Sequence, residues 1–454
     1  MARSLSGSEG TDTPAKKKQR TISDSELSSE DLHQLIQTIN NKKLDFDSER
    51  ICSITLSKLN IYGCLTCGKF FKGFSERSPT FLHSINENHR LFISLNNIQN
   101  NVVILPDEIE INDATPLSKP DRKLIQNIIF ATNPTYDKNL IQSFPQKCHD
   151  CTQNQLYYNG YVGLNKSISN DITYINVLIQ LLAHIVPIRD YFLFYKSSTD
   201  TLIGKISTII KKIWSPHLFK LNIAPDELIS YLMINFPKIF NRPIRDPQFL
   251  LNWLINKLCQ LDPSLKKLLQ KECRGKLKAQ GKTIPFWNLT VNLPTVSMFK
   301  DGKNIDELLQ VNLQDRLVET FLDKSSDKII EQFPKFLFVY ISRFDNMSTQ
   351  DVKDGFIVKN RNQTIVNFSE SLNLPLDSKN TITYKIISNI VHDPQKNLLD
   401  IEKDYKSNWK IQLLKDVKTN DWIEINNIKI SPKNFNLMFL DESYIQVWEK
   451  QENK

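Results

Sequence analysis

Four side chains that can bind a metal ion lie within one short segment of this chain. Cys64 and Cys67 form a Cys-x-x-Cys pair. After a gap of fifteen residues come His83 and then His89, with five residues between them. Zinc takes four such ligands in a tetrahedron, and a Cys-x-x-Cys turn supplies two of them from one loop. Gly68, directly after the pair, allows the tight backbone that such a turn needs. The spacing predicts one Zn2+ bound by these four side chains, with the folding of a small domain coupled to it.

The other cysteines are weaker candidates. Cys52 is an alternative zinc ligand that could exchange with either histidine. Cys148 and Cys151 form a second Cys-x-x-Cys pair in what Lys147 and Asp150 suggest is an exposed loop, with no second ligand pair nearby. A half zinc site, a redox pair and two unrelated thiols all stay open, and unrelated thiols are favoured. Seven cysteines, without the apolar core of a secretory signal at the N-terminus, do not favour a disulfide framework.

Composition limits the class of protein. The 454 residues include 58 Lys and Arg against 50 Asp and Glu, a net charge of +8. No stretch approaches the roughly 18 to 20 uncharged apolar residues that span a bilayer, so no membrane contact is expected. So mild a charge does not indicate nucleic-acid binding by itself. Four lysines near Trp214 could form an RNA-binding surface. Their helical spacing is more typical of the solvated face of a helix, so any RNA contact is expected to be indirect. These lysines are Lys205, Lys211, Lys212 and Lys220.

Changes in composition divide the chain into segments. The N-terminal residues are rich in Ser, Thr and charge, which predicts disorder, and their basic run 16–20 resembles a nuclear import signal. Ser28 is placed to cap a short amphipathic helix, and Pro106, Pro116 and Pro120 mark a linker. We therefore expect a disordered arm (1–28), a short helix and linker (29–49), a zinc-bound domain (50–115), a linker (116–158) and a large domain (159–450).

In the large domain, helical patterns come first and strand patterns later. Apolar residues at three-four spacing predict helices up to about Cys273, among them 226–236 and 249–261. Short apolar runs then predict strands at 286–293, 336–344, 364–368, 382–392, 410–414 and 422–430. Helices and strands segregated in this way predict an α+β domain.

Several motifs resemble those of the ubiquitin-specific proteases, and they occur in the expected order over about residues 50 to 450. The resemblance implies a small zinc-bound UBP-type finger followed by a papain-like ubiquitin-specific-protease fold, with a helical thumb and a β-rich palm and fingers. The similar segments are 63–71, His83, Ser84 and His89 in the finger; 163–165, Tyr174, Asn176, Gln180 and 187–193 around the Cys box; 286–289, 293–294 and 336–344 on strands; and 384–422, with His392, in the His box.

The resemblance also locates the position of the nucleophile. The family needs a thiol at the N-terminus of a helix, a His to deprotonate it, and an Asp or Asn to orient that His. Counted back from Asn176, the thiol position falls on Thr173; counted forward from Gly163, it falls on Asp171. Neither residue is a cysteine, and no cysteine occurs between 151 and 259.

The position of the base is changed as well. It falls on Asn408, whose amide cannot accept a proton near neutral pH. Only the third position, Asn426, keeps a residue compatible with the family, and His392 occupies an earlier, non-catalytic position. The resemblance therefore implies a pseudoenzyme with no catalytic residues.

Loss of both catalytic groups in this fold is similar to the inactive spliceosomal members of the family, the tri-snRNP-associated or snRNP assembly-defective proteins. Segments 359–366 and 443–450 resemble that group more than active proteases. The resemblance implies a nuclear, non-catalytic scaffold or assembly factor in pre-mRNA splicing. It also implies spliceosomal snRNP proteins as partners, notably the tri-snRNP helicase and scaffold proteins.

The alternative is a ubiquitin-binding pseudo-deubiquitinase adaptor outside splicing. The family's finger grips the carboxylate of the ubiquitin tail with a Gly-Arg step. This chain has Gly73-Phe74 there, and Arg77 is out of register. Loss of the bidentate donor counts against binding of the ubiquitin tail.

Overall fold

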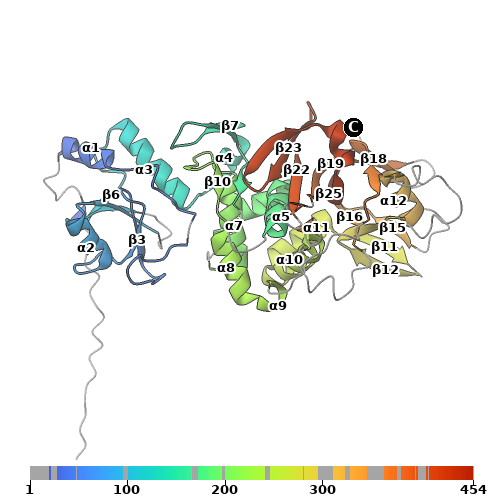
Figure 1. Ribbon diagram of the computed structural model, residues 1–454, viewed down its shortest axis with the longest axis horizontal. Helices are drawn as coiled ribbons and strands as arrows, with labels where there is room; N and C mark the ends of the chain where they lie inside the picture. Colours follow the sequence, from blue (N-terminus) through green and yellow to red (C-terminus); the bar gives the residue numbers. More distant parts are fainter. Residues whose placement is uncertain are drawn as a thin grey trace, which may run out of the picture. The chain divides into compact units, whose positions relative to one another are not determined.

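The structure is a computed structural model in which the chain forms two compact units (Figure 1). The first unit contains residues 1–46 and 50–133, and the second contains 47–49 and 134–454. The structure describes residues 20–21, 28–47, 49–95, 101–165, 172–196, 200–240, 246–279, 281–294, 310–322, 328–344, 362–375, 380–393, 395–396, 405–406 and 408–452.

A six-stranded sheet organises the described part of the first unit. Only the β1–β6 pair is parallel among these strands, and helix α2 (Pro79–Asn86) packs against the edge strand β3. The strands, in spatial order, are β1 (Arg20–Thr21), β6 (Ile109–Ile111), β5 (Val102–Ile104), β4 (Leu91–Ser94), β2 (Ile61–Cys64) and β3 (Phe70–Lys72). Residues 1–28 were predicted to be disordered, but Arg20 and Thr21 of this arm pair with β6 as β1. The other residues before Ser28, including 16–19 of the basic run 16–20, lie outside the described residues.

Helix α1 (Ser29–Gln37) begins at the predicted cap. The Ser28 hydroxyl accepts from Asp31 N, and the Asp31 carboxylate accepts from Ser28 N, which is a capping box. The cap satisfies two backbone donors that the first turn leaves open. Leu32, Leu35 and Ile36 are buried along one side of the helix, as the amphipathic pattern predicts.

The single linker predicted for 116–158 is wrong. Helix α3 (Lys119–Thr132) belongs to the first unit, whereas α4 (Lys138–Gln142), β7 (Lys147–His149) and β8 (Leu156–Tyr158) belong to the second. Pro120 does not interrupt the chain because it lies in the first turn of α3, where the missing N–H has no partner to lose. Ser118 caps this helix by accepting from Asp121 N.

An eight-stranded sheet dominates the described part of the second unit. The pair β13–β16 is parallel and the other pairs in the sheet are antiparallel. The strands, in spatial order, are β13 (Asn288–Asn292), β16 (Phe336–Ser342), β25 (Glu442–Lys450), β19 (Thr381–His392), β22 (Trp409–Asp416), β23 (Asp421–Asn426) and β24 (Lys429–Lys433), and β18 (Ser371–Pro375) also pairs with β19.

One predicted strand of this sheet is wrong. The run 422–430 is divided between β23 and β24 by a two-residue turn at Asn427 and Ile428. Asn427 has a φ of 54°, in the left-handed region that asparagine adopts more readily than most residues. An asparagine at such a turn is a typical hairpin signal, so a closer reading of the turn residues could have found it.

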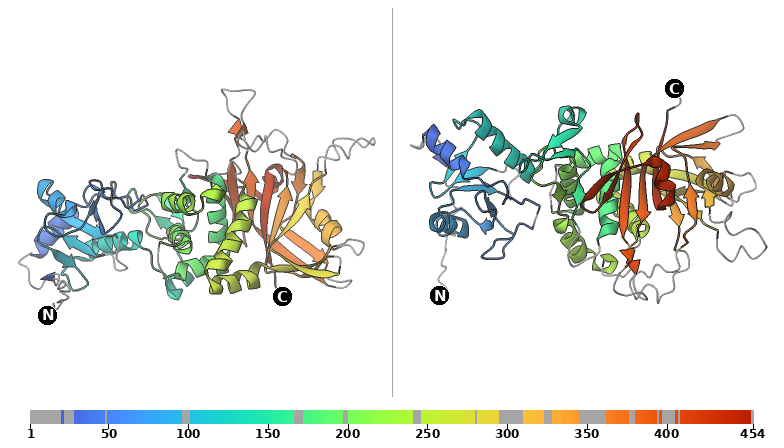
Figure 2. Two further views of the ribbon diagram at one scale, coloured as in Figure 1. Left: turned by 90° about the horizontal axis from the view of Figure 1, so that it is seen from below. Right: turned by 45° about the horizontal axis from the view of Figure 1, so that its top comes forward.

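Helices form the other part of the second unit, beside the sheet (Figure 2). The predicted helices 226–236 and 249–261 are confirmed as α8 (Asp226–Asn235) and α10 (Pro247–Leu261), and the α+β fold is confirmed with them. All residues of α5 from Thr173 to Ala183 are buried. The remaining helices are α5 (Thr173–His184), α6 (Val186–Phe194), α7 (Leu202–Ile213), α9 (Pro237–Phe240), α11 (Pro263–Cys273) and α12 (Leu313–Phe321).

No single helix among the described residues is long and apolar enough to cross a bilayer. Only α5 and α6 taken together have the length and composition, and a bend of 93° separates them.

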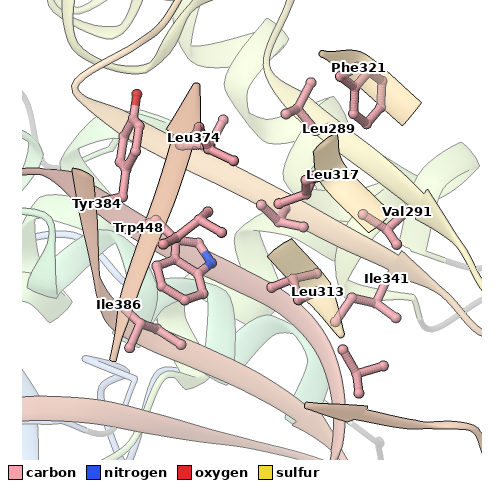
Figure 3. Close-up of a cluster of buried hydrophobic side chains, with 14 of the residues drawn as sticks. Leu289, Val291, Leu313, Leu317, Phe321, Ile341, Leu374, Tyr384, Ile386 and Trp448 are labelled. Carbon is pink, nitrogen blue, oxygen red and sulfur yellow. The ribbon is translucent and has the colours of Figure 1, made fainter. Parts of the chain in front are cut away.

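Apolar side chains fill the space between the large sheet and α12 (Figure 3). Leu313, Leu317 and Phe321 recur every four residues and so share one face of α12. They belong to the same buried cluster as Trp448 of β25, whose side chain is fully enclosed. Tyr384 keeps its hydroxyl satisfied in this core by donating to Pro334 O at 2.5 Å.

His184, the last residue of α5, has enclosed ring nitrogens. Its Nδ1–H donates to Gln180 O at 2.7 Å, and its Nε2 is buried. Burial lowers the pKa of His184 to about 4, against the opposing effect of the hydrogen bond to Gln180. The folded chain therefore holds this imidazole neutral at pH values where the unfolded chain protonates it.

We expect the second unit to lose stability as the pH falls from about 6.5 to about 4, because the unfolded chain binds a proton there that the folded chain excludes. The contribution is complete above about 6.5, and on the order of 3 kcal/mol is lost by pH 4. His184→Gln should flatten this dependence. Urea unfolding followed by tryptophan fluorescence reports on the second unit, which contains all 6 Trp; identical pH slopes for both proteins would refute the assignment.

Candidate metal centre and the predicted catalytic positions

The four predicted zinc ligands meet in the first unit. Their ligand atoms all lie within 4.8 Å of one another, although Cys64 ends β2 and His83 lies on α2. His83 Nε2 is 3.0 Å from His89 Nδ1 and 3.5 Å from Cys67 Sγ. A tetrahedral zinc ion places neighbouring ligand atoms roughly 3.3 to 3.8 Å apart, so the donor set and its spacing fit zinc. This is the one such cluster found among the described residues.

The local backbone explains why Cys64 and Cys67 converge. Gly68 has a φ of 76°, and a Cβ at this position would lie only 2.0 Å from Lys43 O. Its N–H donates to Cys64 O at 2.9 Å and closes the turn. The hydrogen bond from the Cys64 thiol lowers the pKa of Cys67, in keeping with the thiolate form that binds metals.

Cys52 does not join the cluster. It is buried, and its Sγ accepts from Thr55 N at 3.4 Å, so it stabilises the turn that follows it. The alternative that Cys52 replaces a histidine is therefore not supported by the geometry. Sequence spacing alone could not decide between Cys52 and a histidine as the zinc ligand. The position of Cys52 relative to the other ligands depends on how the strands of the sheet pair.

The second Cys-x-x-Cys pair lies in a hairpin turn. Cys148 is buried on β7, and Asp150, predicted to be exposed, is also buried. The Asp150 carboxylate accepts from the backbone N–H groups of Thr152, Gln153 and Gln155. The carboxylate thus stabilises the turn between β7 and β8 from a buried position. The prediction of an exposed loop is therefore wrong at Asp150.

The predicted catalytic positions 173, 408 and 426 also come together, in the second unit. Thr173 is the first residue of α5, and its hydroxyl accepts from Trp409 N at 3.3 Å across 236 residues of sequence. Asn408 Nδ2 donates to Asn426 Oδ1 at 3.3 Å. The other nucleophile candidate, Asp171, lies outside the described residues.

Two of these three side chains are buried. Thr173 is 0% exposed and Asn408 is 1% exposed. His392 ends β19, where its Nδ1 is 3.0 Å from Glu442 Oε2 and its ring packs on Trp409 with centroids 4.9 Å apart. His392 is therefore held at the end of its strand by its contact with Glu442 and by ring packing.

The short strand β9 (Gly163–Leu164), which lies beside the helices of the second unit, contacts the turn between β23 and β24. Leu164 of β9 donates its N–H to Asn427 O at 3.1 Å. A Cβ on Gly163 would lie 2.6 Å from Ile428 Cα, so this approach needs glycine. Asn176 Nδ2 donates to Asn165 O at 3.2 Å and holds the strand on α5. Gly163 and Asn176 were recognisable in the sequence, but the backbone contact between Leu164 and Asn427 was not, because it joins distant segments.

Three of the four lysines of the candidate RNA surface bind within the fold. Lys205 Nζ is 3.1 Å from Glu227, and Lys212 Nζ is 2.6 Å from Asp47. Lys211 donates to Tyr195 O at 2.6 Å, and burial lowers its pKa to about 8. These ammonium groups are held within the packing of α7, so the solvated face predicted for them is wrong at these three lysines.

Comparison with protein families identifies both units. Residues 168–448 match the family model described as ubiquitin carboxyl-terminal hydrolase. Residues 52–115 match the model described as Zn-finger in ubiquitin-hydrolases and other protein. The first match covers more than half of the chain and all of the large sheet's strands.

Individual relatives narrow the assignment. The chain is 37% identical to pre-mRNA-splicing factor SAD1 of Saccharomyces cerevisiae over 94% of its length and 95% of that protein. It is 26% identical to the probable mRNA-splicing protein ubp10 of Schizosaccharomyces pombe over 91% of its length and 88% of that protein. Human ubiquitin carboxyl-terminal hydrolase 39 is 28% identical, with coverage of 92% and 80%.

A solved structure agrees with these relatives. The crystal structure of an essential yeast splicing factor superposes with a TM-score of 0.78 at 38% identity, covering 92% of this chain and 100% of that one. The chain therefore belongs to the ubiquitin carboxyl-terminal hydrolase family and, within it, to the group of pre-mRNA-splicing factors that includes SAD1.

Proposed function

We propose that this chain acts in pre-mRNA splicing as a non-catalytic factor that promotes the assembly or stability of the tri-snRNP. The splicing role is that of its relatives SAD1 and ubp10. The observation that carries the non-catalytic role is the buried Thr173 at the start of α5, beside Asn408 and Asn426.

Two physical arguments support the loss of catalysis. First, a threonine hydroxyl far from the chain's N-terminus needs a base, and the nearby Asn408 amide cannot take its proton. Second, Thr173 has no exposed surface, so a peptide carbonyl cannot reach its hydroxyl in this conformation.

Partners and location follow from the same proposal. We expect spliceosomal snRNP proteins as partners, including the helicase and scaffold proteins of the tri-snRNP, in the nucleus, with run 16–20 as the import signal. Ubiquitin-tail binding is not expected. Phe74, at the position of the family's arginine, packs against Tyr62 with ring centroids 5.5 Å apart and offers no charged donor.

Zinc in the first unit completes the proposal. Cys64, Cys67, His83 and His89 would hold it, and its role there would be structural because all four positions are filled by the protein. The hydrophobic core around the site is small, so binding of the ion would contribute part of the free energy that keeps this unit folded.

Elemental analysis of the purified chain should find one zinc per molecule. Cys64→Ser should lose the metal and unfold the first unit, because binding and folding are coupled there. Cys52→Ser is the matched control and should keep zinc, since Cys52 lies outside the cluster. Wild-type protein without stoichiometric zinc would refute the assignment.

The closed cleft should protect a thiol placed in it. Thr173→Cys should neither cleave ubiquitin chains nor react with an electrophilic ubiquitin probe, since no base is present. Iodoacetamide should label Cys at position 173 at least ~100-fold more slowly than Cys in the control Ile428→Cys, whose side chain is 58% exposed in the wild type. Mass spectrometry of the peptides separates these sites from native cysteines. Fast labelling at 173 in native protein would show an open cleft.

Splicing should depend on the protein but not on its former catalytic positions. Depletion in cells should raise the ratio of unspliced to spliced RNA, measured by sequencing. Expression of Thr173→Val with Asn426→Ala should restore splicing like the wild type, provided that thermal unfolding shows both proteins folded. Normal splicing after depletion would overturn the splicing role, and a folded variant that fails would give the cleft a function.

A further inference from the structure

Three large apolar side chains are exposed within six residues of the finger. Ile54 is 64% exposed, Leu56 is 76% exposed and Leu59 is 74% exposed. Single exposed apolar residues are normal on protein surfaces, but a local group of them marks an interaction site more often than chance. We call residues 53–59 the apolar loop. It lies next to β3, the edge strand of the sheet in the first unit.

The apolar loop is held in one conformation. Cys52 N donates to Ser57 O at 2.9 Å, and Leu56 N donates back to Cys52 O at 3.0 Å. Ser53 N donates to Phe70 O at 2.8 Å, which ties the loop to β3. A surface that is already ordered loses little conformational entropy when it binds, so this loop presents its side chains in a form suited to docking.

Leu56 adds a second, independent observation. Its φ is 55°, in the left-handed region that a residue with a branched apolar side chain rarely adopts. Asparagine or glycine would fit this backbone better. Strained backbone positions of this kind cluster at binding sites, where the exposed side chain is needed despite the strain.

Charge indicates what kind of partner fits. The sequence from Ile51 to Ser75 contains no Asp or Glu, and its Lys58, Lys69 and Lys72 are exposed. A basic margin around an apolar centre complements an acidic partner. Single-stranded nucleic acid stacks on aromatic side chains, whereas the exposed residues here are aliphatic, which favours a protein.

We propose that the apolar loop docks an acidic amphipathic helix of a partner protein. Leu56 would contact the apolar stripe of that helix, with Ile54 and Leu59 beside it, and the lysines would face its carboxylates. Five extended residues span at most about 17 Å, and the turn closed by the Leu56 N to Cys52 O hydrogen bond shortens this distance. A helix stripe at i, i+3, i+4 and i+7 covers about 10 Å, which suits so compact a group. This inference concerns the finger surface and does not rest on the splicing role.

The test uses the full chain and three fluorescent probes. The first probe is an 18-residue helical peptide with one stripe of Leu and Glu elsewhere; the second has Lys in place of Glu; the third is single-stranded oligouridine. Anisotropy should show binding of the acidic peptide alone, weakened at least tenfold by Ile54→Ser with Leu59→Ser. The matched control, Leu437→Ser with Leu440→Ser, changes two exposed leucines of the second unit and should bind like the wild type.

Leu56→Asn separates docking from a structural role. Asparagine suits the left-handed backbone, so this variant should melt at the same or a higher temperature while binding the acidic peptide at least tenfold more weakly. Unchanged acidic-peptide binding in the loop variants would overturn the proposal. So would equal or tighter binding of the Lys peptide or oligouridine, or a wild-type dimer in sedimentation that the loop variants abolish.

Discussion

Helix α5 is the element on which the second unit depends. It contacts α6, α7 and α10 on the helical side and β22 on the side of the sheet. Because its residues from Thr173 to Ala183 are buried, its position is determined by packing in nearly every direction. The Thr173 hydroxyl then accepts from Trp409 N, so the start of the helix and the strand that carries the former base position are held together. Both the fold and the closed cleft follow from this one placement.

Polar groups in the large sheet make its strand order specific. Asn389 Nδ2 donates to Gln412 Oε1 and to Ser443 Oγ, which joins β19, β22 and β25. Gln412 Nε2 donates in turn to Glu424 and Asp441. A shift of register by one residue would turn these groups to the other face and leave buried amides without partners. The sheet therefore keeps a precise geometry around the predicted catalytic positions.

The two units hold the predicted site residues in different ways. In the second unit Thr173 begins the buried helix α5, and the amide of Asn408 donates to Asn426. In the first unit the four predicted zinc ligands lie together, and Phe74 packs against Tyr62. A protein with the proposed non-catalytic role would act through its surfaces, and the apolar loop of the finger is one surface whose exposure and backbone conformation packing does not explain.

Much of this was determined by the sequence itself, wherever the physics is local. The spacing of Cys64, Cys67, His83 and His89 predicted their convergence, because a turn and a short helix limit where these side chains can lie. Apolar patterns predicted α8, α10 and the strands β13, β16, β19 and β22 of the large sheet, and Ser28 predicted the start of α1. Only the tertiary structure could show that Cys52 stays outside the metal cluster, or that β9 meets the Asn427 turn beside a buried Thr173. The contact between Thr173 and Trp409 alone joins residues 236 apart in the sequence. The geometry of such contacts depends on how whole elements pack rather than on any local pattern.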